Sequence, residues 1–424
     1  MRSENFFVRL TAVLATFTLT LLAAVTPATA QQETILHSFP SSAKDGVGPT
    51  GNLIFDAAGN LYGTAYLGGS STACPSLPGC GIVFELTPAA GGGWTEKILH
   101  QFNYTGGAEP QGLILDPAGN LYGVALGGGS TQAGIVYELT PSTNGTWAEK
   151  VLHTFNTTTE GYPEPGLVLD AAGNLYGTAG AGGEYGYGIV FELTHSASGY
   201  WTAKTLHNFN KNGFDGYNAN GPLVMDAAGN LYGTTYYGGV YGAGTAFELQ
   251  HSSGGGWTEV NLHNFNNNGN TDGYYPQDGL VFDTAGNLYG TTSVGGTYSF
   301  GTVFEVSPVS GGKWHETVLH NFSATAGDGG LPSDGLFVDA AGNLYGTTSY
   351  GGAYLYWGTA FEMSPTSDGT WNETVLHSFG SGTDGSLPVG SVILDGAGNV
   401  YGTTYRGGTY GTSESGGTVF EVTP

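Results

Sequence analysis

Two kinds of side chain that can transfer protons recur along the chain at regular spacing. A glutamate follows Phe or Tyr in seven runs of the form "VFELT", and a histidine lies in seven runs of the form "LHxF". They are Glu85, Glu138, Glu192, Glu248, Glu305, Glu362 and Glu421, with His37, His100, His153, His207, His263, His320 and His377. A carboxylate beside an imidazole can act as a general acid–base pair. Because a catalytic centre is one asymmetric place, seven equivalent pairs instead favour a buried cross-strand hydrogen bond in each repeat.

The elements that carry these side chains are short strands in a repeat of 54 to 60 residues. Each unit has four runs rich in β-branched and aromatic residues, separated by Gly, Asn and Ser and without a helical period. We therefore predict an all-β fold, a seven-bladed β-propeller of four-stranded antiparallel blades. The corners of the repeats begin at Asp56, Asp116, Asp170, Asp226, Asp283, Asp339 and Asp395.

The two ends of the chain predict how the ring closes. The last unit finishes at "GTVFEVTP" without a "WTExxLHxF" run, and "ETILHSF" (33–39) near the start supplies the missing strand. We expect this N-terminal strand to complete the last blade, so that residues 31–424 form one propeller domain.

The corner "DAAGNLYGT" (170–178) predicts a tight turn. The Asp170 carboxylate can accept N–H groups of the turn, and Gly173 can take a positive φ without steric cost. We expect a structural role for all seven corners. The six tryptophans that open the fourth strands are expected to pack between blades. They are Trp94, Trp147, Trp201, Trp257, Trp314 and Trp371.

The N-terminus has the pattern of a secretory signal. Arg2 and Arg9 give the segment a positively charged start, and an apolar run follows from Leu10 to about Val25. Ala28-Thr29-Ala30 then has the small-x-small form of a cleavage site. The alternative, a membrane anchor, is disfavoured because the run is short and no positive flank follows it. We expect residues 1–30 to be a signal peptide cleaved near Ala30. The mature protein is then secreted or periplasmic, without a membrane span.

The net charge limits the classes of partner, and the two cysteines indicate a disulfide. The formal net charge is −25, which disfavours nucleic acid and anionic membrane surfaces as partners. We expect a monomer. Cys74 and Cys80 lie in "ACPSLPGCG", which in an exported protein predicts a disulfide. A two-cysteine metal site is the alternative, but no histidine lies close by in the sequence.

The unit "LHxF…DG…P…DxxGNLYGTTxxGG…GTVFELTP…W" resembles the GloVer (Gloeo_Verruco) tandem repeats over essentially the whole mature chain. Its "DxxGN(L/V)Y" core is similar to the corner motif of NHL-type propellers. The resemblance implies a secreted or surface-anchored bacterial protein and brings no catalytic residues. Family members often carry a C-terminal anchoring segment, whereas this sequence ends on a strand at Pro424.

Function is expected where the repeats differ. The second-to-third and blade-to-blade loops vary most, and in a four-stranded antiparallel blade they emerge on one face. They are rich in Tyr, Gly and Asn, which suit sugar rings because aromatic faces stack while amides bond hydroxyls. We predict a non-catalytic module that binds a polysaccharide or envelope glycan, or a surface protein. The candidate ligand-binding residues are Tyr185, Tyr187, Tyr236, Tyr237, Tyr241, Tyr298, Tyr350, Tyr354, Tyr356, Trp357, Tyr405, Arg406 and Tyr410.

Four alternatives stay open. The tyrosines could instead pack the glycine-rich loops together. A propeller glycoside hydrolase or polysaccharide lyase would need non-equivalent carboxylates at the rim or channel mouth, and Glu184 and Glu414 fall in non-neighbouring blades. A structural cell-envelope scaffold would show a uniform rim. Calcium is the one cofactor considered: Asn268, Asn270 and Asp272 have alternate spacing, but the acidic twelfth position is missing. The Asp-Gly pairs, including this one, favour turns.

Overall fold

The computed structural model describes residues 32–40, 44–74, 77–252, 254–267, 272–332, 334–380, 383–409 and 416–424. The predicted signal peptide lies outside these ranges, as do Asn268, Asn270 and Tyr410. Within them, every regular element of the secondary structure is a β-strand.

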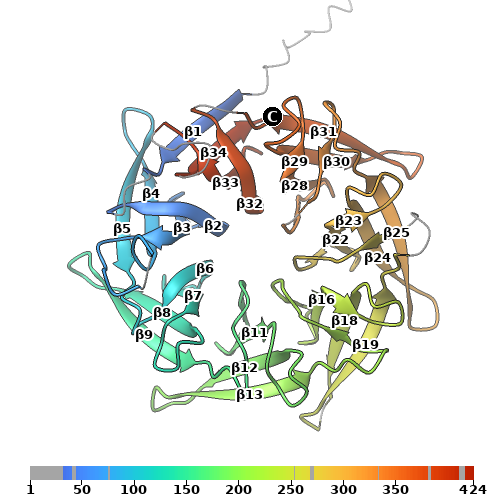
Figure 1. Ribbon diagram of the computed structural model, residues 1–424, viewed down its shortest axis with the longest axis horizontal. Coiled ribbons are helices and arrows are strands. Elements are labelled where there is room, and N and C mark those ends of the chain that lie inside the picture. Colours follow the sequence, from blue (N-terminus) through green and yellow to red (C-terminus); the bar gives the residue numbers. More distant parts are fainter. Residues whose placement is uncertain are drawn as a thin grey trace, which may run out of the picture.

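Seven four-stranded antiparallel sheets stand around a ring (Figure 1), which confirms the predicted seven-bladed β-propeller. The first strand of each blade lies nearest the centre: β2 (Gly46–Phe55), β6 (Ala108–Leu115), β10 (Val168–Leu169), β15 (Val224–Met225), β21 (Val281–Phe282), β27 (Phe337–Val338) and β32 (Gly385–Leu394). We number the blades 1 to 7 in this order. The second strands are β3 (Leu61–Gly68), β7 (Leu121–Gly127), β11 (Leu175–Ala179), β16 (Leu231–Thr235), β22 (Leu288–Thr292), β28 (Leu344–Thr348) and β33 (Val400–Gly407).

The outer half of each blade is an antiparallel pair of strands, which is a hairpin in blades 1 to 6. The third strands are β4 (Ile82–Pro88), β8 (Ile135–Pro141), β12 (Ile189–His195), β18 (Thr245–His251), β24 (Thr302–Val309), β30 (Thr359–Pro365) and β34 (Thr418–Thr423). The outermost strands are β5 (Trp94–Gln101), β9 (Trp147–Thr154), β13 (Trp201–Asn208), β19 (Trp257–Asn264), β25 (Lys313–Asn321), β31 (Trp371–Ser378) and β1 (Gln32–Ser38).

The ring closes through strand β1, as the sequence predicts. This strand pairs antiparallel with β34, from Gln32 opposite Thr423 to Ser38 opposite Thr418. Blade 7 therefore takes its outermost strand from the N-terminal side of the chain and its other three strands from the C-terminal side (Figure 1).

The two kinds of variable loop lie on the same face. In blades 4, 5 and 6 the segment entering the blade pairs with the second-to-third loop in a two-stranded ladder. These ladders are β14 (Gly216–Tyr217) with β17 (Tyr237–Gly238), β20 (Gly273–Tyr274) with β23 (Val294–Gly295), and β26 (Gly329–Gly330) with β29 (Tyr350–Gly351). We call the face that carries these loops the upper face. The opposite, lower face carries the corner turns and the third-to-fourth hairpins.

Each corner is held by one aspartate. Asp170 Oδ1 accepts the Ala172 and Asn174 backbone N–H groups, both at 2.8 Å, and Asp170 Oδ2 accepts the Asn174 side-chain amide at 2.8 Å. Gly173 has a φ of 85°. The predicted turn is confirmed, and it recurs in all seven blades with the same partners.

The blades pack on one another through aromatic and aliphatic side chains. Each tryptophan of an outermost strand meets, edge to face, a second-strand tyrosine of the preceding blade; Trp257 and Tyr176 lie 6.4 Å apart between ring centroids. The same contact is made by all six tryptophans, which confirms their predicted packing between blades. The cores therefore lie between blades and join the ring into one unit.

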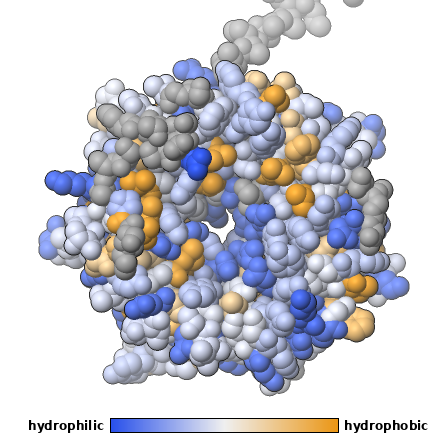
Figure 2. Space-filling view, in the orientation of Figure 1, coloured by the Kyte–Doolittle hydropathy of each residue, from blue (hydrophilic) through white to orange (hydrophobic). Residues whose placement is uncertain are grey.

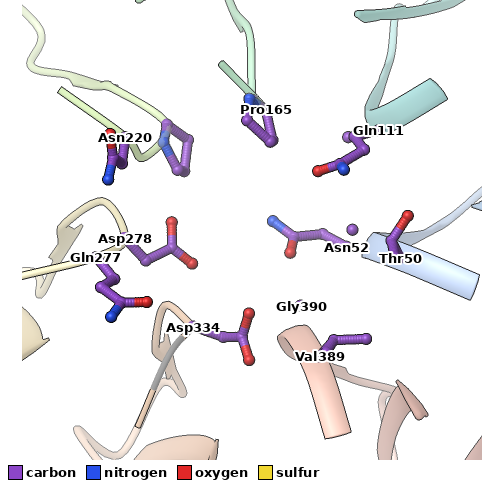
Figure 3. Close-up of a pocket in the computed structure, with 14 residues that line it drawn as sticks. Thr50, Asn52, Gln111, Pro165, Asn220, Gln277, Asp278, Asp334, Val389 and Gly390 are labelled. Carbon is purple, nitrogen blue, oxygen red and sulfur yellow. The ribbon is translucent and has the colours of Figure 1, made fainter. Parts of the chain in front are cut away.

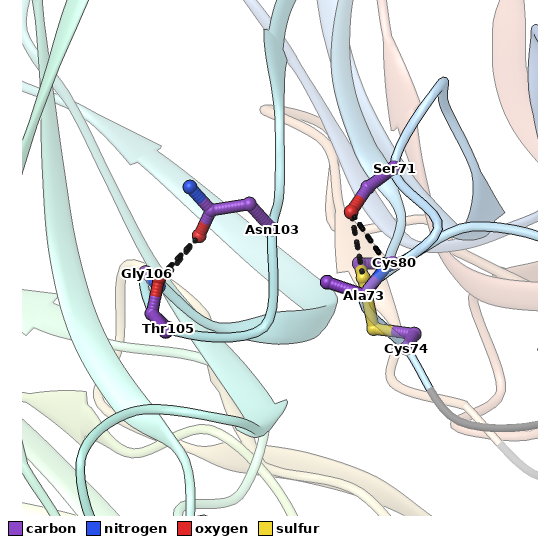
Figure 4. Close-up of a disulfide and its surroundings, with 7 residues drawn as sticks. All are labelled: Ser71, Ala73, Cys74, Cys80, Asn103, Thr105 and Gly106. Atoms are coloured by element: carbon purple, nitrogen blue, oxygen red, sulfur yellow. Dashed lines mark hydrogen bonds between the residues drawn. A yellow bond between two sulfur atoms is a disulfide. The ribbon is translucent and has the colours of Figure 1, made fainter.

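One loop on blade 1 is closed covalently. Cys74 and Cys80 form the predicted disulfide, six residues apart in sequence (Figure 4). Ser71 Oγ accepts the Ala73 N–H at 3.2 Å and lies 3.5 Å from Cys80 Sγ, so the loop also has internal hydrogen bonds. No helix in the described ranges has both the length and the apolar character that crossing a membrane requires.

Candidate functional site

The third-strand glutamates do not bond the histidines of their own blade, so the predicted cross-strand pair is wrong. Glu192 Oε1 lies 3.1 Å from the Tyr176 hydroxyl, which is also 3.2 Å from Asp170 Oδ2 at the corner. Burial, followed by the charges of Glu192 and Asp170, raises the pKa of Tyr176 well above its ordinary value. The glutamate thus belongs to the corner network.

The fourth-strand histidines instead face carboxylates of the next blade. A β-bulge before each histidine interrupts the alternation of inward and outward side chains along the strand. The histidine and the leucine before it can therefore both face inward. His207 of β13 lies 3.5 Å from Asp215, in the segment entering blade 4, and 3.7 Å from Glu259 of β19. This aspartate is part of an Asp-Gly pair that the sequence assigned only to a turn.

Five of the seven blade interfaces have such a His–Asp–Glu cluster, with all ligand atoms within 4.8 Å of one another. They are His37/Asp45/Glu96, His207/Asp215/Glu259, His263/Asp272/Glu316, His320/Asp328/Glu373 and Glu33/His377/Asp384. Among the residues that the structure describes, the two other interfaces have one carboxylate each, Glu149 beside His100 at 3.4 Å and Glu160 beside His153 at 3.0 Å.

The clusters hold two carboxylates close together in a partly buried place. Burial, and after it the facing aspartate, raises the pKa of each glutamate. That pKa reaches about 7 for Glu96, Glu316 and Glu373, about 8 for Glu33 and about 9 for Glu259. Like charges brought together out of water favour an uptake of protons or cations.

Of the three residues considered as calcium ligands, the structure describes Asp272. The Asp272 carboxylate lies 3.1 Å from His263 and accepts the Asn266 N–H at 3.0 Å, so it forms part of a blade-interface cluster. Asn268 and Asn270, the other two predicted ligands, lie outside the described residues.

Tyrosines gather on the upper face of blades 3 to 5 in one continuous row. Tyr217 lies 5.2 Å from Tyr187 and is stacked on Tyr237 at 5.5 Å. Tyr237 meets Tyr236, which stacks at 4.9 Å and 14° on Tyr275. Of this row the sequence prediction contained Tyr187, Tyr236 and Tyr237. It missed Tyr217, Tyr274 and Tyr275, although all three lie in blade-to-blade loops whose aromatic content was visible.

The other predicted tyrosines are spread around the rim. Those at loop tips have roughly half or more of their surface exposed: Tyr185, Tyr241, Tyr298, Tyr354 and Tyr356. Tyr350 stacks on Phe300 with rings 7° from parallel, and Trp357 is packed against the core beside blade 7. The Arg406 guanidinium lies 5.9 Å from the Tyr405 ring centre. Tyr410 is outside the described residues.

A pocket of about 520 Å³ lies beside the tyrosine row, where blades 4, 5 and 6 meet. We call it the tyrosine pocket. It is lined by Tyr236, Tyr274, Tyr275, Gln277, Ser293, Val294, Leu331 and Ser349. Aromatic walls with a few hydroxyl and amide groups are the usual lining of a small-molecule site.

Two residues of the pocket have the left-handed backbone conformation, which residues other than glycine rarely adopt. Tyr275 has a φ of 60° and Leu331 a φ of 54°. In this conformation the Tyr275 N–H donates to Ala243 O of blade 4 at 2.9 Å, and the Leu331 N–H to Phe300 O of blade 5 at 2.7 Å. These bonds join neighbouring blades and fix the two side chains at the pocket.

The central channel is a second cavity, of about 310 Å³, lined by residues from all seven blades. Asn52, Gln277, Asp278 and Asp334 extend toward its centre, whereas Pro165 and Val389 make other parts of its wall apolar (Figure 3). Figure 2 shows the ring hollowed at its centre, with hydrophilic side chains gathered on one side of the opening. The channel is therefore asymmetric although the repeats are alike.

The two channel aspartates differ in their surroundings from the repeated acids. Asp278 is partly buried, and its oxygens accept the Gly279 N–H at 2.6 Å and the Gly335 N–H of blade 6. Burial and then the charge of Asp334 raise the pKa of Asp278 to about 7. Gln277 lines both the channel and the tyrosine pocket, which makes these two cavities neighbours.

Comparison with known proteins identifies the repeat. Residues 11–178 and 129–354 match the family model described as the Gloeobacter/Verrucomicrobia repeat. The chain belongs to this family. The match agrees with the resemblance seen in the sequence, and no curated protein matches the chain.

Solved structures similar to this Gloeobacter/Verrucomicrobia repeat protein have low sequence identity. A protein of unknown function from Dyadobacter fermentans is 11% identical, with a TM-score of 0.43 over 92% of this chain and 99% of that one. A protein proposed as a gluconolactonase is 12% identical, with a TM-score of 0.40 over 93% and 92% of the chains. The extracellular domain of a proposed one-component system from B. thetaiotaomicron is 13% identical, with a TM-score of 0.49 over 92% of this chain and 42% of that one. These likenesses say nothing of ligands or activity.

The site thus has three layers in this Gloeobacter/Verrucomicrobia repeat ring. Corner networks recur in all seven blades and hold the fold. Histidine–carboxylate clusters recur at the blade interfaces with variations. The tyrosine pocket and the channel, in contrast, are lined by residues that differ from blade to blade. We place the candidate binding site in this third layer.

Proposed function

We propose that this protein is an exported, non-catalytic binding propeller, and that its ligand is a carbohydrate held at the tyrosine pocket. The observation that carries the proposal is the combination of fixed aromatic faces and polar groups around one cavity. Tyr236 and Tyr275 are stacked on each other, and Tyr237 and Tyr274 hold them edge-on. Aromatic rings that are already ordered lose little entropy when a ligand stacks on them.

The polar groups of the pocket suit a ligand with many hydroxyls. Ser293 Oγ donates to Tyr275 O and Ser349 Oγ to Leu331 O, both at 2.9 Å, so each serine oxygen keeps lone pairs with which to accept. Gln277 adds a side-chain amide to the lining of the pocket beside Tyr236. The formal net charge of −25 favours an uncharged glycan over a polyanion.

Two independent features support export, the N-terminal sequence and the disulfide. The N-terminal sequence has the charge, apolar run and small residues of a secretory signal. The Cys74–Cys80 disulfide suits a compartment where disulfides persist, which is the periplasm or the exterior of the cell.

A second candidate, a glycoside hydrolase or lyase, is favoured by one observation. Asp278 and Asp334 occupy the same position of two adjacent repeats, and together they place two carboxylates in one sector of the channel, as such an enzyme would require. However, each oxygen of Asp278 already accepts an N–H group, one from Gly279 of its own blade and one from Gly335 of the next, which fixes the carboxylate in the channel wall. We therefore prefer binding without turnover.

The experiment is a pull-down of the purified protein with a panel of soluble and insoluble polysaccharides, with reducing ends scored in the same tubes. Retention without new reducing ends would support the binding module and identify the glycan. New reducing ends that disappear in Asp334→Asn would replace it with the enzyme. Neither signal on any glycan would refute the carbohydrate proposal and favour a protein-contact scaffold in the cell envelope.

A further inference from the structure

Two of the five His–Asp–Glu clusters, around His37 and His207, have a buried histidine nitrogen without a hydrogen-bond partner, and around His207 all three side chains have such an atom. At the interface of blades 3 and 4, His207 Nε2, Asp215 Oδ1 and Glu259 Oε1 are all buried atoms without a hydrogen-bond partner. Asp215 is the most buried of the three, with 8% of its side chain exposed. Buried polar atoms in native proteins are nearly always satisfied, so three in one place need an explanation.

The spacing of the three side chains differs from that of a hydrogen bond. His207 Nε2 lies 3.5 Å from Asp215 Oδ2 and 3.7 Å from Glu259 Oε2. Two ligands of one tetrahedral zinc ion, each bonded at about 2.1 Å, lie about 3.4 Å apart. Four of the equivalent histidine–carboxylate pairs are closed to 3.0–3.3 Å, which are hydrogen-bond distances, whereas His100–Glu149 and His37–Asp45 are open to 3.4 and 3.6 Å.

The three side chains are also held in place by the fold. Asp215 Oδ2 accepts the Asn210 N–H at 2.8 Å, and Asp215 O accepts the Gly239 N–H at 2.8 Å, which fixes the loop. The His207 ring packs edge-on against Phe209, with centroids 4.8 Å apart. A ligand set that is ordered before binding is what a metal site requires.

Charge supports the same conclusion. Among the described residues, the ion pairs of Asp215 and Glu259 are formed with His207 alone. Lys211, close by in sequence, lies over the Tyr217 ring at 5.5 Å instead. With a neutral imidazole and both carboxylates ionised, the site has a formal charge of −2, which a divalent cation would balance after displacing the proton that Glu259 holds.

We propose that His207, Asp215 and Glu259 form a binding site for a divalent transition metal ion of the zinc class. One imidazole nitrogen and two carboxylate oxygens are a donor set that zinc accepts, with a fourth position left for water. Calcium prefers six to eight oxygen ligands and suits this set less well. The ion would tie blade 3 to blade 4, two residues before Tyr217 of the tyrosine row. The proposal does not depend on what the tyrosine pocket binds.

The test is zinc binding by the purified, untagged full protein after treatment with a chelator, measured by equilibrium dialysis and metal analysis. We expect Asp215→Asn and Glu259→Gln each to lose one zinc equivalent relative to the wild type. The matched control is Glu160→Gln, at the interface with a single carboxylate, which should keep the wild-type number of equivalents. The melting temperature without metal reports whether each variant folds.

A second measurement uses cobalt(II) as a spectroscopic probe of the same site. The wild type should give the visible absorption of four-coordinate cobalt. Glu259→Gln should lose the absorption that comes from this site. The gain-of-site variant Ala203→Glu supplies the missing third ligand beside His153 and Glu160 and should add one equivalent. Zinc stoichiometry that is the same in wild type, Asp215→Asn and Glu259→Gln, or no zinc bound by the wild type, would overturn the proposal.

Discussion

The lower and upper faces of the ring differ in how similar the seven repeats are. On the lower face, all seven corners have the same aspartate, asparagine and tyrosine with nearly identical hydrogen bonds. On the upper face, the position that follows the second strand is Tyr236 in blade 4, Ser293 in blade 5 and Ser349 in blade 6. Repetition therefore marks the groups that hold the ring, and divergence marks the place where a single ligand can be recognised.

The corner should be the most sensitive single position for stability. Asp170→Ala removes the acceptor of two backbone N–H groups and one side-chain amide, and we expect a loss of roughly 2–4 kcal/mol in unfolding free energy. Urea unfolding followed by tryptophan fluorescence measures it. The equivalent Asp226→Ala should behave alike, and the exposed Ala171→Ser should change little. A loss below about 1 kcal/mol at both corners would contradict the structural role.

A smaller loss is expected where a glycine makes room for an aromatic ring. A Cβ on Gly177 would lie 2.6 Å from Phe191 Cζ and 3.1 Å from Leu167 Cδ2. Gly177→Ala should therefore cost about 1–3 kcal/mol through overpacking, measured in the same unfolding assay. Gly91→Ala, with no atom within 4 Å, is the control and should be close to neutral. Adding Phe191→Leu should restore part of the loss; if it deepens the loss instead, the clash is not the cause.

A partly buried carboxyl in blade 3 makes stability depend on pH. Burial raises the pKa of Glu164 to about 8. Because the folded-state pKa is the higher one, the contribution of Glu164 is complete below pH 4.5 and is lost as the pH rises through 8. The slope is at most about 1.4 kcal/mol per pH unit.

Glu164→Gln should remove this part of the pH dependence and melt at a higher temperature than the wild type at pH 8. Melting curves between pH 5 and 9 measure the effect. Exposed Glu184→Gln should leave the profile unchanged. If the Glu164→Gln and wild-type profiles are parallel across this range, the carboxyl is ionised in the folded protein.

The smallest effect is expected at an exposed ion pair. Lys97 Nζ lies 3.8 Å from Glu85 Oε2, and half of the Lys97 side chain is exposed. Lys97→Ala should change the unfolding free energy by less than about 0.5 kcal/mol, because solvent screens such a pair. A loss above about 1 kcal/mol would mean that this lysine supports the corner network of blade 1.

The sequence was sufficient for features that lie within one repeat. The corner turn depends on Asp170 and Gly173, which are three residues apart, and the closure depends on a missing strand that can be counted. The face that carries the variable loops follows from strand number alone, and the ladder of β14 with β17 agrees with it.

Contacts between repeats were harder to predict. His207 meets Asp215 and Glu259 only because the next blade lies against its own, and the β-bulge that turns the histidine inward has no evident sequence signal. Seven copies of a glutamate and a histidine pointed to a pair within one blade, which was wrong. Likewise, Asp278 and Asp334 come together only at the centre of the ring.

The most direct test of the central claim is calorimetric titration of the wild type, Tyr236→Ala and Tyr200→Ala with the glycan retained in the pull-down. Tyr236 is part of the tyrosine pocket, whereas Tyr200 lies in a lower-face hairpin with 75% of its surface exposed. We predict an affinity at least about tenfold weaker for Tyr236→Ala, which corresponds to about 1.4 kcal/mol, with an unchanged melting temperature. Tyr200→Ala should bind as the wild type does. Equal affinity of Tyr236→Ala and the wild type would contradict the placement of the ligand on the divergent face.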